Sequence, residues 1–118
     1  MNPVTLIEHW YAGPDKLLLA ESVVWHLAPH FPFGGTYYGK DSVFEQVFAP
    51  LLVRYQDWHI TLDEVFDAGG QVMATGTYRG HYNSPQGNHL QLSRFVHLWQ
   101  IKQGQIVSFR QYVEDNFQ

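Results

Sequence analysis

His26 is the residue whose type and setting point most directly to chemistry. It lies in SVVWHL, residues 22–27, a stretch typical of a buried β-strand. With an unperturbed pKa of ~6.5, histidine exchanges protons near pH 7 and can act as a general base or acid. A histidine in such a strand either completes its hydrogen bonds inside the core or faces a cavity, and only the second position serves catalysis.

Three further polar side chains fall among apolar residues of later segments. Alternate residues of a strand face opposite sides of a sheet. Glu64 alternates with Leu62 and Phe66, and burial on that face would raise the pKa of its carboxyl group. Tyr78 and Gln111 fall on faces that we expect to point inward, where they would orient a carbonyl or hydroxyl group while Glu64 serves as a second acid. The alternatives are a strand end in solvent for Glu64 and simple packing for Tyr78.

Other motifs predict no further chemistry. No two histidines have the H-x-H spacing or a proline-free i, i+4 spacing of a metal site, so we expect no metal ion. GGTYYGK, residues 34–40, has the letters of a phosphate loop, but Asp41 stands where a serine or threonine must bind magnesium. The chain has no cysteine, which excludes a thiolate nucleophile and fits a reducing compartment.

The composition is that of one globular domain spanning residues 1–118. Hydrophobic residues make up 45% of the chain and charged residues only 15%, so disorder is not expected. The formal net charge is -4 and the lysines and arginines are scattered, which argues against a nucleic-acid partner or an anionic membrane surface. No segment has the ~20 apolar residues of a membrane span or the pattern of a secretion signal. We therefore expect a cytoplasmic protein.

The elements that must position these residues follow from hydrophobic periodicity. A helix is expected from the Asn2–Pro3 cap to Gly13, a short helical segment over 14–20, and a longer helix through Val43 to Tyr55 that Pro50 should kink or split. After it the period changes from 3.6 to 2, and the predicted strands cover 58–67, 71–82, 91–102 and 105–114. Helices followed by an antiparallel meander predict an α+β fold with helices covering one face of a curved sheet.

The last hairpin decides which side chains face inward. With Gln103 and Gly104 as its turn, Leu98 lies opposite Phe109. The resulting apolar face carries Val96, Leu98, Phe109, Gln111 and Val113, and we expect it to be concave. The other face carries His97, Trp99, Arg110 and Tyr112, and we expect it to form a homodimer interface. A β-bulge between Gln91 and Lys102 would instead move His97 into the pocket.

The whole chain resembles a known family through SVVWHL, YYGKDSVFEQVF and RFVHLWQIKQGQIVSFRQYVED. These segments, in this order after the N-terminal helices, are similar to the SnoaL-like branch of the nuclear transport factor 2-like superfamily, which also holds ketosteroid isomerases, limonene epoxide hydrolases and polyketide cyclases. The resemblance implies a cone-shaped α+β domain, with helices packed on a curved antiparallel or mixed sheet around an apolar pocket. It does not imply one reaction, because the superfamily hosts many.

The resemblance also implies roles for single residues. Aligned on SVVWHL, His26 falls at the catalytic carboxylate of the ketosteroid isomerases, whereas Leu6 and Val96 replace their two oxyanion donors. Without those donors we do not expect ketosteroid isomerase activity. The residues expected to line the pocket are Trp25, Phe33, Tyr37, Val96, Leu98, Phe109 and Val113.

Two functions of different classes fit these observations. The first is a cofactor-free isomerase, cyclase or hydrolase that uses acid–base catalysis by His26, Tyr78, Gln111 and Glu64 on a small hydrophobic molecule, such as a polyketide, steroid-like or terpenoid compound. The second is a binding or protein-interaction module that uses the same fold without turnover. The pH dependence of turnover and the presence of a bound molecule beside His26 would distinguish them.

Overall fold

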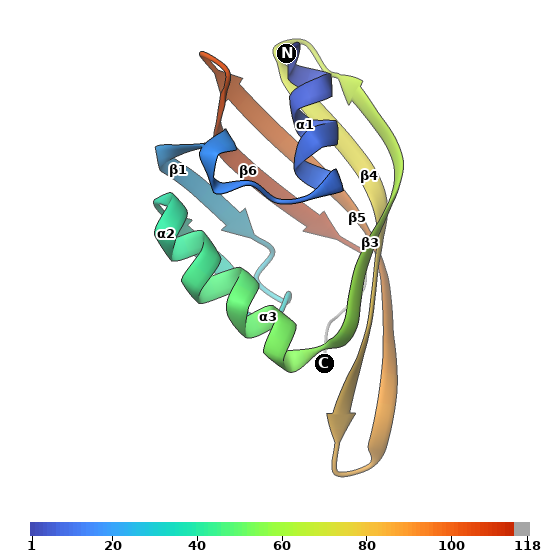
Figure 1. Cartoon of the computed structure of the whole chain (residues 1–118). Helices are drawn as coiled ribbons and strands as arrows, with labels where there is room; N and C mark the ends of the chain where they lie inside the picture. The colour runs from blue at the N-terminus through green and yellow to red at the C-terminus, as the bar shows by residue number, and fades with distance from the viewer. Residues whose placement is uncertain (115–118) are drawn as a thin grey trace.

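The computed structural model describes residues 1–114, and its helices lie on one side of a single sheet (Figure 1). The helical elements are α1 (Pro3–Ala12), the 3-10 turn η1 (Lys16–Leu18), α2 (Lys40–Val43), the π-helical turn η2 (Phe44–Phe48) and α3 (Ala49–Arg54). The strands are β1 (Leu19–Leu27), β2 (Gly35–Tyr38), β3 (Gln56–Asp67), β4 (Gln71–Ser84), β5 (Gly87–Lys102) and β6 (Gln105–Val113). This order confirms the predicted α+β fold class.

Helix α1 begins and ends where the sequence predicts. The side chain of Asn2 accepts a hydrogen bond from the Thr5 N–H at 2.8 Å, which satisfies one of the free amides of the first turn. Pro3 occupies the first turn, where its missing N–H costs nothing. Leu6, Ile7 and Trp10 are buried on one face, so the helix packs onto the sheet through that face.

The second helical stretch is continuous from α2 to α3, with the π-helical turn between them (Figure 1). Pro50 lies in the first turn of α3, directly after this π-helical turn. Because proline has no amide hydrogen, it cannot donate to the carbonyl four residues earlier, and the helix widens there instead of kinking. The predicted interruption at Pro50 thus takes the form of a π-helical turn.

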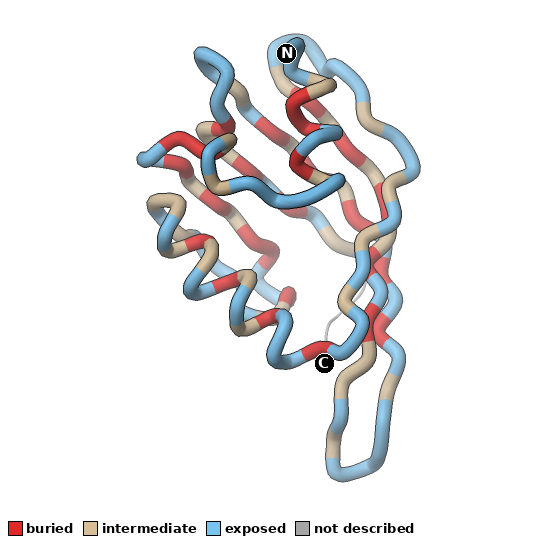
Figure 2. Tube along the Cα trace, in the orientation of Figure 1, coloured by how far each residue is buried: buried red, intermediate tan, exposed pale blue. Residues whose placement is uncertain are grey.

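The sheet is mixed and has the order β2-β1-β6-β5-β4-β3. Strand β1 runs parallel to β6 and antiparallel to the short edge strand β2, which is not among the predicted strands. Strands β3 to β6 form the predicted antiparallel meander. The hairpin of β4 and β5 extends past the other strands, and its far end is exposed (Figures 1 and 2).

A β-bulge at Val107 changes the predicted register of β5 and β6. Ile101 pairs with Ile106, as expected from the turn, but Gln100 pairs with Ser108, so Val107 is an extra residue on β6. Trp99 therefore lies opposite Phe109, and the prediction that Leu98 occupies this position is wrong. We considered a bulge between Gln91 and Lys102 in β5, but the bulge lies on the neighbouring strand β6. It reverses which side chains of β5 face the concave side of the sheet.

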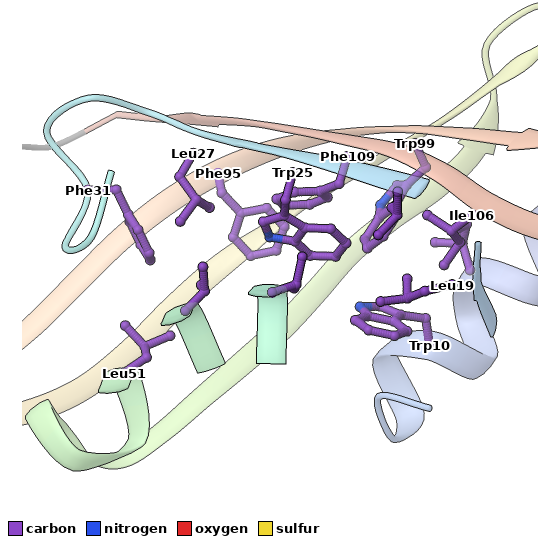
Figure 3. Packing of buried hydrophobic residues seen from close by; sticks show 14 of the residues in the cluster. Trp10, Leu19, Trp25, Leu27, Phe31, Leu51, Phe95, Trp99, Ile106 and Phe109 are labelled. Atoms are coloured by element: carbon purple, nitrogen blue, oxygen red, sulfur yellow. The ribbon is translucent and has the colours of Figure 1, made fainter. Parts of the chain in front are cut away.

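The core lies between the concave face of the sheet and the helices, and it consists largely of aromatic rings. Figure 3 shows Trp25, Trp99 and Phe109 pointing from the sheet toward Trp10 of α1. Trp25 stacks on Phe109 with ring centroids 4.1 Å apart, and the Trp10 ring lies 5.9 Å from that of Trp99. Such ring pairs contribute about 0.5–1.5 kcal/mol each beyond the area they bury.

Among residues 1–114, no helix has the length and apolar character that crossing a bilayer requires. Helix α1 has 10 residues, and the continuous helical stretch from α2 to α3 runs from Lys40 to Arg54.

Candidate functional site

A pocket of about 460 Å³ opens between the concave face of the sheet and the helices. Its wall is formed by side chains of α1, β1, the α2–α3 helical stretch and the inner face of the meander: Trp10, Tyr11, Pro14, Trp25, Leu27, Phe31, Phe44, Val47, Phe48, Ala49, Leu51, Leu52, Ile60, Tyr78, His97, Trp99, Phe109 and Gln111. Within the described part of the chain, no lysine, arginine, aspartate or glutamate lines this pocket. It is therefore suited to an uncharged, mainly apolar molecule.

His97 is the central polar residue of the pocket wall. It is 2% exposed and lies between two tyrosines, with Nδ1 2.5 Å from the hydroxyl oxygen of Tyr11 and Nε2 2.5 Å from that of Tyr78. Its ring also stacks on Phe95, with centroids 3.9 Å apart. These contacts fix the position and the orientation of the imidazole ring. A phenol hydroxyl group lies beside each of its nitrogens.

Each of the two phenols is held by a further N–H donor. The Trp99 indole N–H donates to the Tyr11 hydroxyl oxygen at 3.0 Å. The Gln111 side-chain N–H donates to the Tyr78 hydroxyl oxygen at 2.8 Å, while the backbone N–H of Ala28 donates to Gln111 Oε1 at 3.1 Å. Since the backbone fixes which end of the Gln111 amide is the donor, the network runs unbroken from Ala28 to Trp99.

Burial keeps every ionisable member of this network uncharged. Desolvation lowers the pKa of His97 well below its usual value of 6.5, so its imidazole is neutral at physiological pH. Desolvation also raises the pKa values of Tyr11 and Tyr78 above the usual 10.0, so both hydroxyl groups stay protonated. The site can therefore donate and accept hydrogen bonds, and pass protons along them, without carrying a net charge.

Four of the residues predicted for the pocket lie there. Tyr78 and Gln111 take part in the His97 network. Trp25 and Phe109 form the stacked pair on the pocket wall. All four lie in β1, β4 and β6, where the expected alternation of faces holds.

The prediction that His26 faces the pocket is wrong. His26 pairs with Arg110 across β1 and β6, on the outer face of the sheet, while its neighbour Trp25 points inward. Its Nδ1 lies 3.2 Å from the Thr36 hydroxyl oxygen. Desolvation, and then the nearby Arg110 charge, lower the pKa of His26. The histidine lines a separate hollow beside Pro29 and is not among the residues that line the pocket.

Glu64 also points away from the pocket, because a second bulge intervenes. Leu62 pairs with Gly76 and Glu64 with Thr75, which leaves Asp63 as an extra residue in β3. The alternation predicted from Leu62 is reversed beyond this point, and Glu64 is exposed. The carboxylate thus ends in solvent, which is the alternative that the sequence left open.

The remaining predicted pocket residues lie outside the pocket. Val96 and Leu98 point outward because of the bulge at Val107, and Val113 packs at the edge of the core. Phe33 is partly exposed in a left-handed conformation with φ 63°. The Tyr37 hydroxyl donates to the Phe33 carbonyl at 2.5 Å, so this pair closes the loop before β2.

Three functional candidates were not assigned to the pocket from the sequence. His97 and Trp99 were expected on the outer face, and only the possible bulge indicated otherwise. Both are buried, so neither is available for the predicted dimer interface, whereas Arg110 and Tyr112 are exposed. Tyr11 shares the apolar side of α1 with Trp10, a pattern that indicates packing and gives no sign of the hydroxyl's position.

Metal ligands do not cluster in the part of the chain from residue 1 to 114: it contains no group of three or more histidine, cysteine, aspartate or glutamate side chains that could hold an ion. The pocket histidine is engaged by two tyrosines. Its hydrogen bonds thus leave neither ring nitrogen directed at a metal position.

The buried His97 should make the protein less stable in mild acid. Because its pKa is lowered only in the folded state, the unfolded chain binds an extra proton below pH ~6.5, and the free energy of unfolding falls by at most about 1.4 kcal/mol per pH unit from this group. Urea unfolding between pH 7 and pH 5 measures this slope. His97→Gln should flatten it, and the exposed-site control His59→Gln should not; equal slopes in the wild type and His97→Gln would contradict the assignment.

A sequence-family model, described as the SnoaL-like domain, matches residues 16–109. No curated protein is similar enough in sequence to match the chain. A solved nuclear transport factor 2-like protein from Burkholderia thailandensis is 26% identical, with a TM-score of 0.86 over 97% of this chain and 92% of that one. TerC, co-crystallised with polyporic acid, is 20% identical, with a TM-score of 0.77 over 95% and 91% of the two chains. A phenazine biosynthesis-related protein from Pseudomonas aeruginosa is 18% identical, with a TM-score of 0.76 over 95% and 79%.

Proposed function

We propose, from the premise that the chain belongs to the SnoaL-like family, that its pocket binds a small, uncharged, largely aromatic or polycyclic molecule and moves a proton on it without a cofactor. The observation that carries the proposal is a neutral imidazole, His97, held between two protonated phenols in an uncharged aromatic pocket. Two proteins of the same fold, TerC co-crystallised with polyporic acid and the phenazine biosynthesis-related protein, support a small organic ligand for this pocket.

The chemistry available to the network is proton transfer through the phenols. Both nitrogens of His97 face tyrosine hydroxyl oxygens, so the imidazole exchanges protons with a ligand through Tyr11 or Tyr78. A carbonyl group that receives a hydrogen bond from a phenol is polarised, which makes the hydrogens on the adjacent carbon more acidic. Keto–enol isomerisation, and ring closures or eliminations that begin with it, are therefore the reactions that this site supports best.

A binding module without turnover is the second candidate. The observation that favours it is the enclosure of His97: its ring is buried and both of its nitrogens are already engaged, so the imidazole does not reach a ligand directly. In this case the network serves only to orient the bound molecule.

Binding is tested with 1-tetralone, an uncharged bicyclic ketone, by quenching of tryptophan fluorescence. Trp10, Trp25 and Trp99 line the pocket, so a bound ligand should change their emission. Ala49→Trp places a large ring at an exposed position of the pocket rim and should weaken binding by about tenfold. Gln46→Trp, on the outside of the same helical stretch, is the matched control and should leave the affinity unchanged.

Proton transfer is tested by exchange of the ketone's α-hydrogens with deuterium in heavy water, followed by NMR. The wild type should accelerate the exchange, and His97→Gln should lose most of the acceleration while still binding 1-tetralone. Exchange that proceeds equally fast with His97→Gln would sink the acid–base role. Saturable binding without any acceleration in the wild type would favour the binding module.

A homodimer through the outer face of the sheet is also part of the proposal. Arg110 and Tyr112 are exposed on this face, as expected, and Val96 and Leu98 take the places that the sequence assigned to His97 and Trp99. The face thus carries two apolar side chains beside Arg110 and Tyr112, which supports an interface between copies of the chain.

A further inference from the structure

The hydrogen atoms in the His97 network can be counted. Two phenol hydroxyl groups and one neutral imidazole carry three exchangeable hydrogens, and the two short contacts, Tyr11–His97 and His97–Tyr78, use one each. The third hydrogen must point away from both contacts. It belongs to whichever tyrosine accepts a hydrogen bond from the imidazole.

Two arrangements satisfy both contacts, and they differ in the tautomer of His97. If the hydrogen is on Nδ1, the imidazole donates to Tyr11, Tyr78 donates to Nε2, and the Tyr11 hydroxyl hydrogen is directed elsewhere. If the hydrogen is on Nε2, the directions are reversed and the Tyr78 hydroxyl hydrogen is directed elsewhere. The tautomer therefore selects which phenol offers a donor beyond the network.

The two phenols differ in their accessibility. Tyr78 is 4% exposed, and its oxygen accepts the N–H of the backbone-anchored Gln111. Both phenols border the pocket, but Tyr11, at the end of α1, is only half-buried, so water or a ligand reaches it more readily and can accept its hydrogen. The arrangement with the hydrogen on Nδ1 thus places the third hydrogen on the more accessible phenol.

We propose that the network is directed from the Ala28 amide through Gln111, Tyr78 and His97 to Tyr11, and that the Tyr11 hydroxyl is the donor that selects ligands with a carbonyl oxygen. This inference rests on the proposed function for the presence of a ligand, but the direction of the network does not depend on it. A ketone or quinone oxygen that accepts a hydrogen bond from the Tyr11 hydroxyl completes the directed chain of hydrogen bonds. A hydrocarbon of the same shape leaves the Tyr11 hydroxyl without that acceptor.

The surroundings of Tyr11 strengthen this donor. In the proposed direction its oxygen accepts two N–H groups, from Trp99 and from His97 Nδ1. Hydrogen bonds in a chain polarise one another, so a phenol that accepts two becomes a better donor. The Trp99 ring, which meets Tyr11 edge-on with centroids 5.7 Å apart, and the stacked His97 ring hold the phenol in this position.

The direction is measured by ¹⁵N NMR of the histidine side chain, because the two tautomers have distinct nitrogen shifts. The wild type should carry its hydrogen on Nδ1 of His97. Tyr11→Phe should move it to Nε2, because Tyr78 becomes the remaining phenol acceptor, whereas Tyr78→Phe should leave it on Nδ1. A wild type with the hydrogen on Nε2, or a tautomer that changes in Tyr78→Phe and not in Tyr11→Phe, would overturn the proposed direction.

Ligand selection is measured with 1-tetralone and tetralin, which differ only by the carbonyl group. The wild type should bind 1-tetralone about fivefold more tightly than tetralin, and Tyr11→Phe should reduce this ratio to near one. Tyr38→Phe, at a tyrosine exposed on β2, should keep the wild-type ratio. A ratio unchanged by Tyr11→Phe would overturn the role of Tyr11 while leaving the pocket's function intact. Failure of both compounds to bind would instead count against the proposed function, and the NMR experiment would still decide the direction.

Discussion

Trp99→Ala is expected to lower the free energy of unfolding by about 3–5 kcal/mol, the range for truncating a large ring in a packed core. Trp99 is 1% exposed and is one of the largest fully buried side chains. Its ring contacts those of Trp10, Trp25 and Phe109 at centroid distances of 5.9, 5.6 and 4.6 Å. Its removal leaves a cavity among aromatic neighbours that cannot all collapse into it.

Urea or thermal unfolding measures this loss, and two variants sharpen it. Trp99→Phe keeps much of the ring but removes the N–H donor to Tyr11, so it should cost less than Trp99→Ala. Tyr38→Ala, at an aromatic residue that is 72% exposed, should change the free energy of unfolding by no more than about 0.5 kcal/mol. A Trp99→Ala variant as stable as Tyr38→Ala would show that the core is not packed as described.

Gly34→Ala is expected to cost about 3 kcal/mol, at the upper end of the range for overpacking. A Cβ atom at Gly34 would lie 2.3 Å from the Ala28 carbonyl oxygen, 2.8 Å from that of Pro29 and 2.9 Å from that of Phe31. All three obstacles are backbone atoms, so no rotation of a side chain relieves them. The loop before β2 must shift as a whole.

The same substitution should disturb the pocket, because Ala28 holds Gln111 through its backbone N–H. We therefore expect weaker binding of 1-tetralone in Gly34→Ala together with the loss of stability. Gly13→Ala is the matched control: a Cβ there meets nothing within 4 Å and the backbone is extended, so it should change neither property. Equal stability of the two variants would contradict the close packing of the loop.

The fold could be predicted from the sequence because its signals are local and repeated. The Asn2–Pro3 cap, the helical spacing of Leu6, Ile7 and Trp10, and the change of period after Tyr55 each indicate one element. The segments that resemble the SnoaL-like family then specify how the elements are arranged. The edge strand β2 carried too few residues, four, between glycines and prolines to be distinguished from a loop.

The site was predicted only in part because alternation along a strand fails at a bulge. Gln111 and Phe109 were placed correctly because both follow Val107 on β6, where the strand alternates regularly. The apolar residues of this part of β6 were enough to indicate which face is buried. His97 and Glu64 were predicted on the wrong face of the sheet. In each case one extra residue, in β6 or in β3, shifts the alternation. A single extra residue leaves no trace in composition or propensity, so the register of the partner strand is needed to find it.

His26 was misplaced for a different reason. The family position suggested a proton-transfer group in β1, but the pairing of Trp25 with Phe109 turns Trp25 inward and His26 outward. The large ring takes the concave face because burying it there contributes more than burying an imidazole. In this chain the histidine of the pocket comes from β5.

The unpaired residue Val107 means that the chemistry of this protein depends on how β5 and β6 pair as well as on residue type. If Val107 paired with Gln100 in a regular ladder, Leu98 would lie opposite Phe109, Val96 would lie opposite Gln111, and His97 would turn toward solvent with every amino acid unchanged. Deletion of Val107 would instead keep Trp99 opposite Phe109 and His97 opposite Gln111, because the shortened strand would form the same pairs without a bulge. A relative that lacks only this extra residue would therefore share the pocket face, whereas one of the same length that pairs regularly would not.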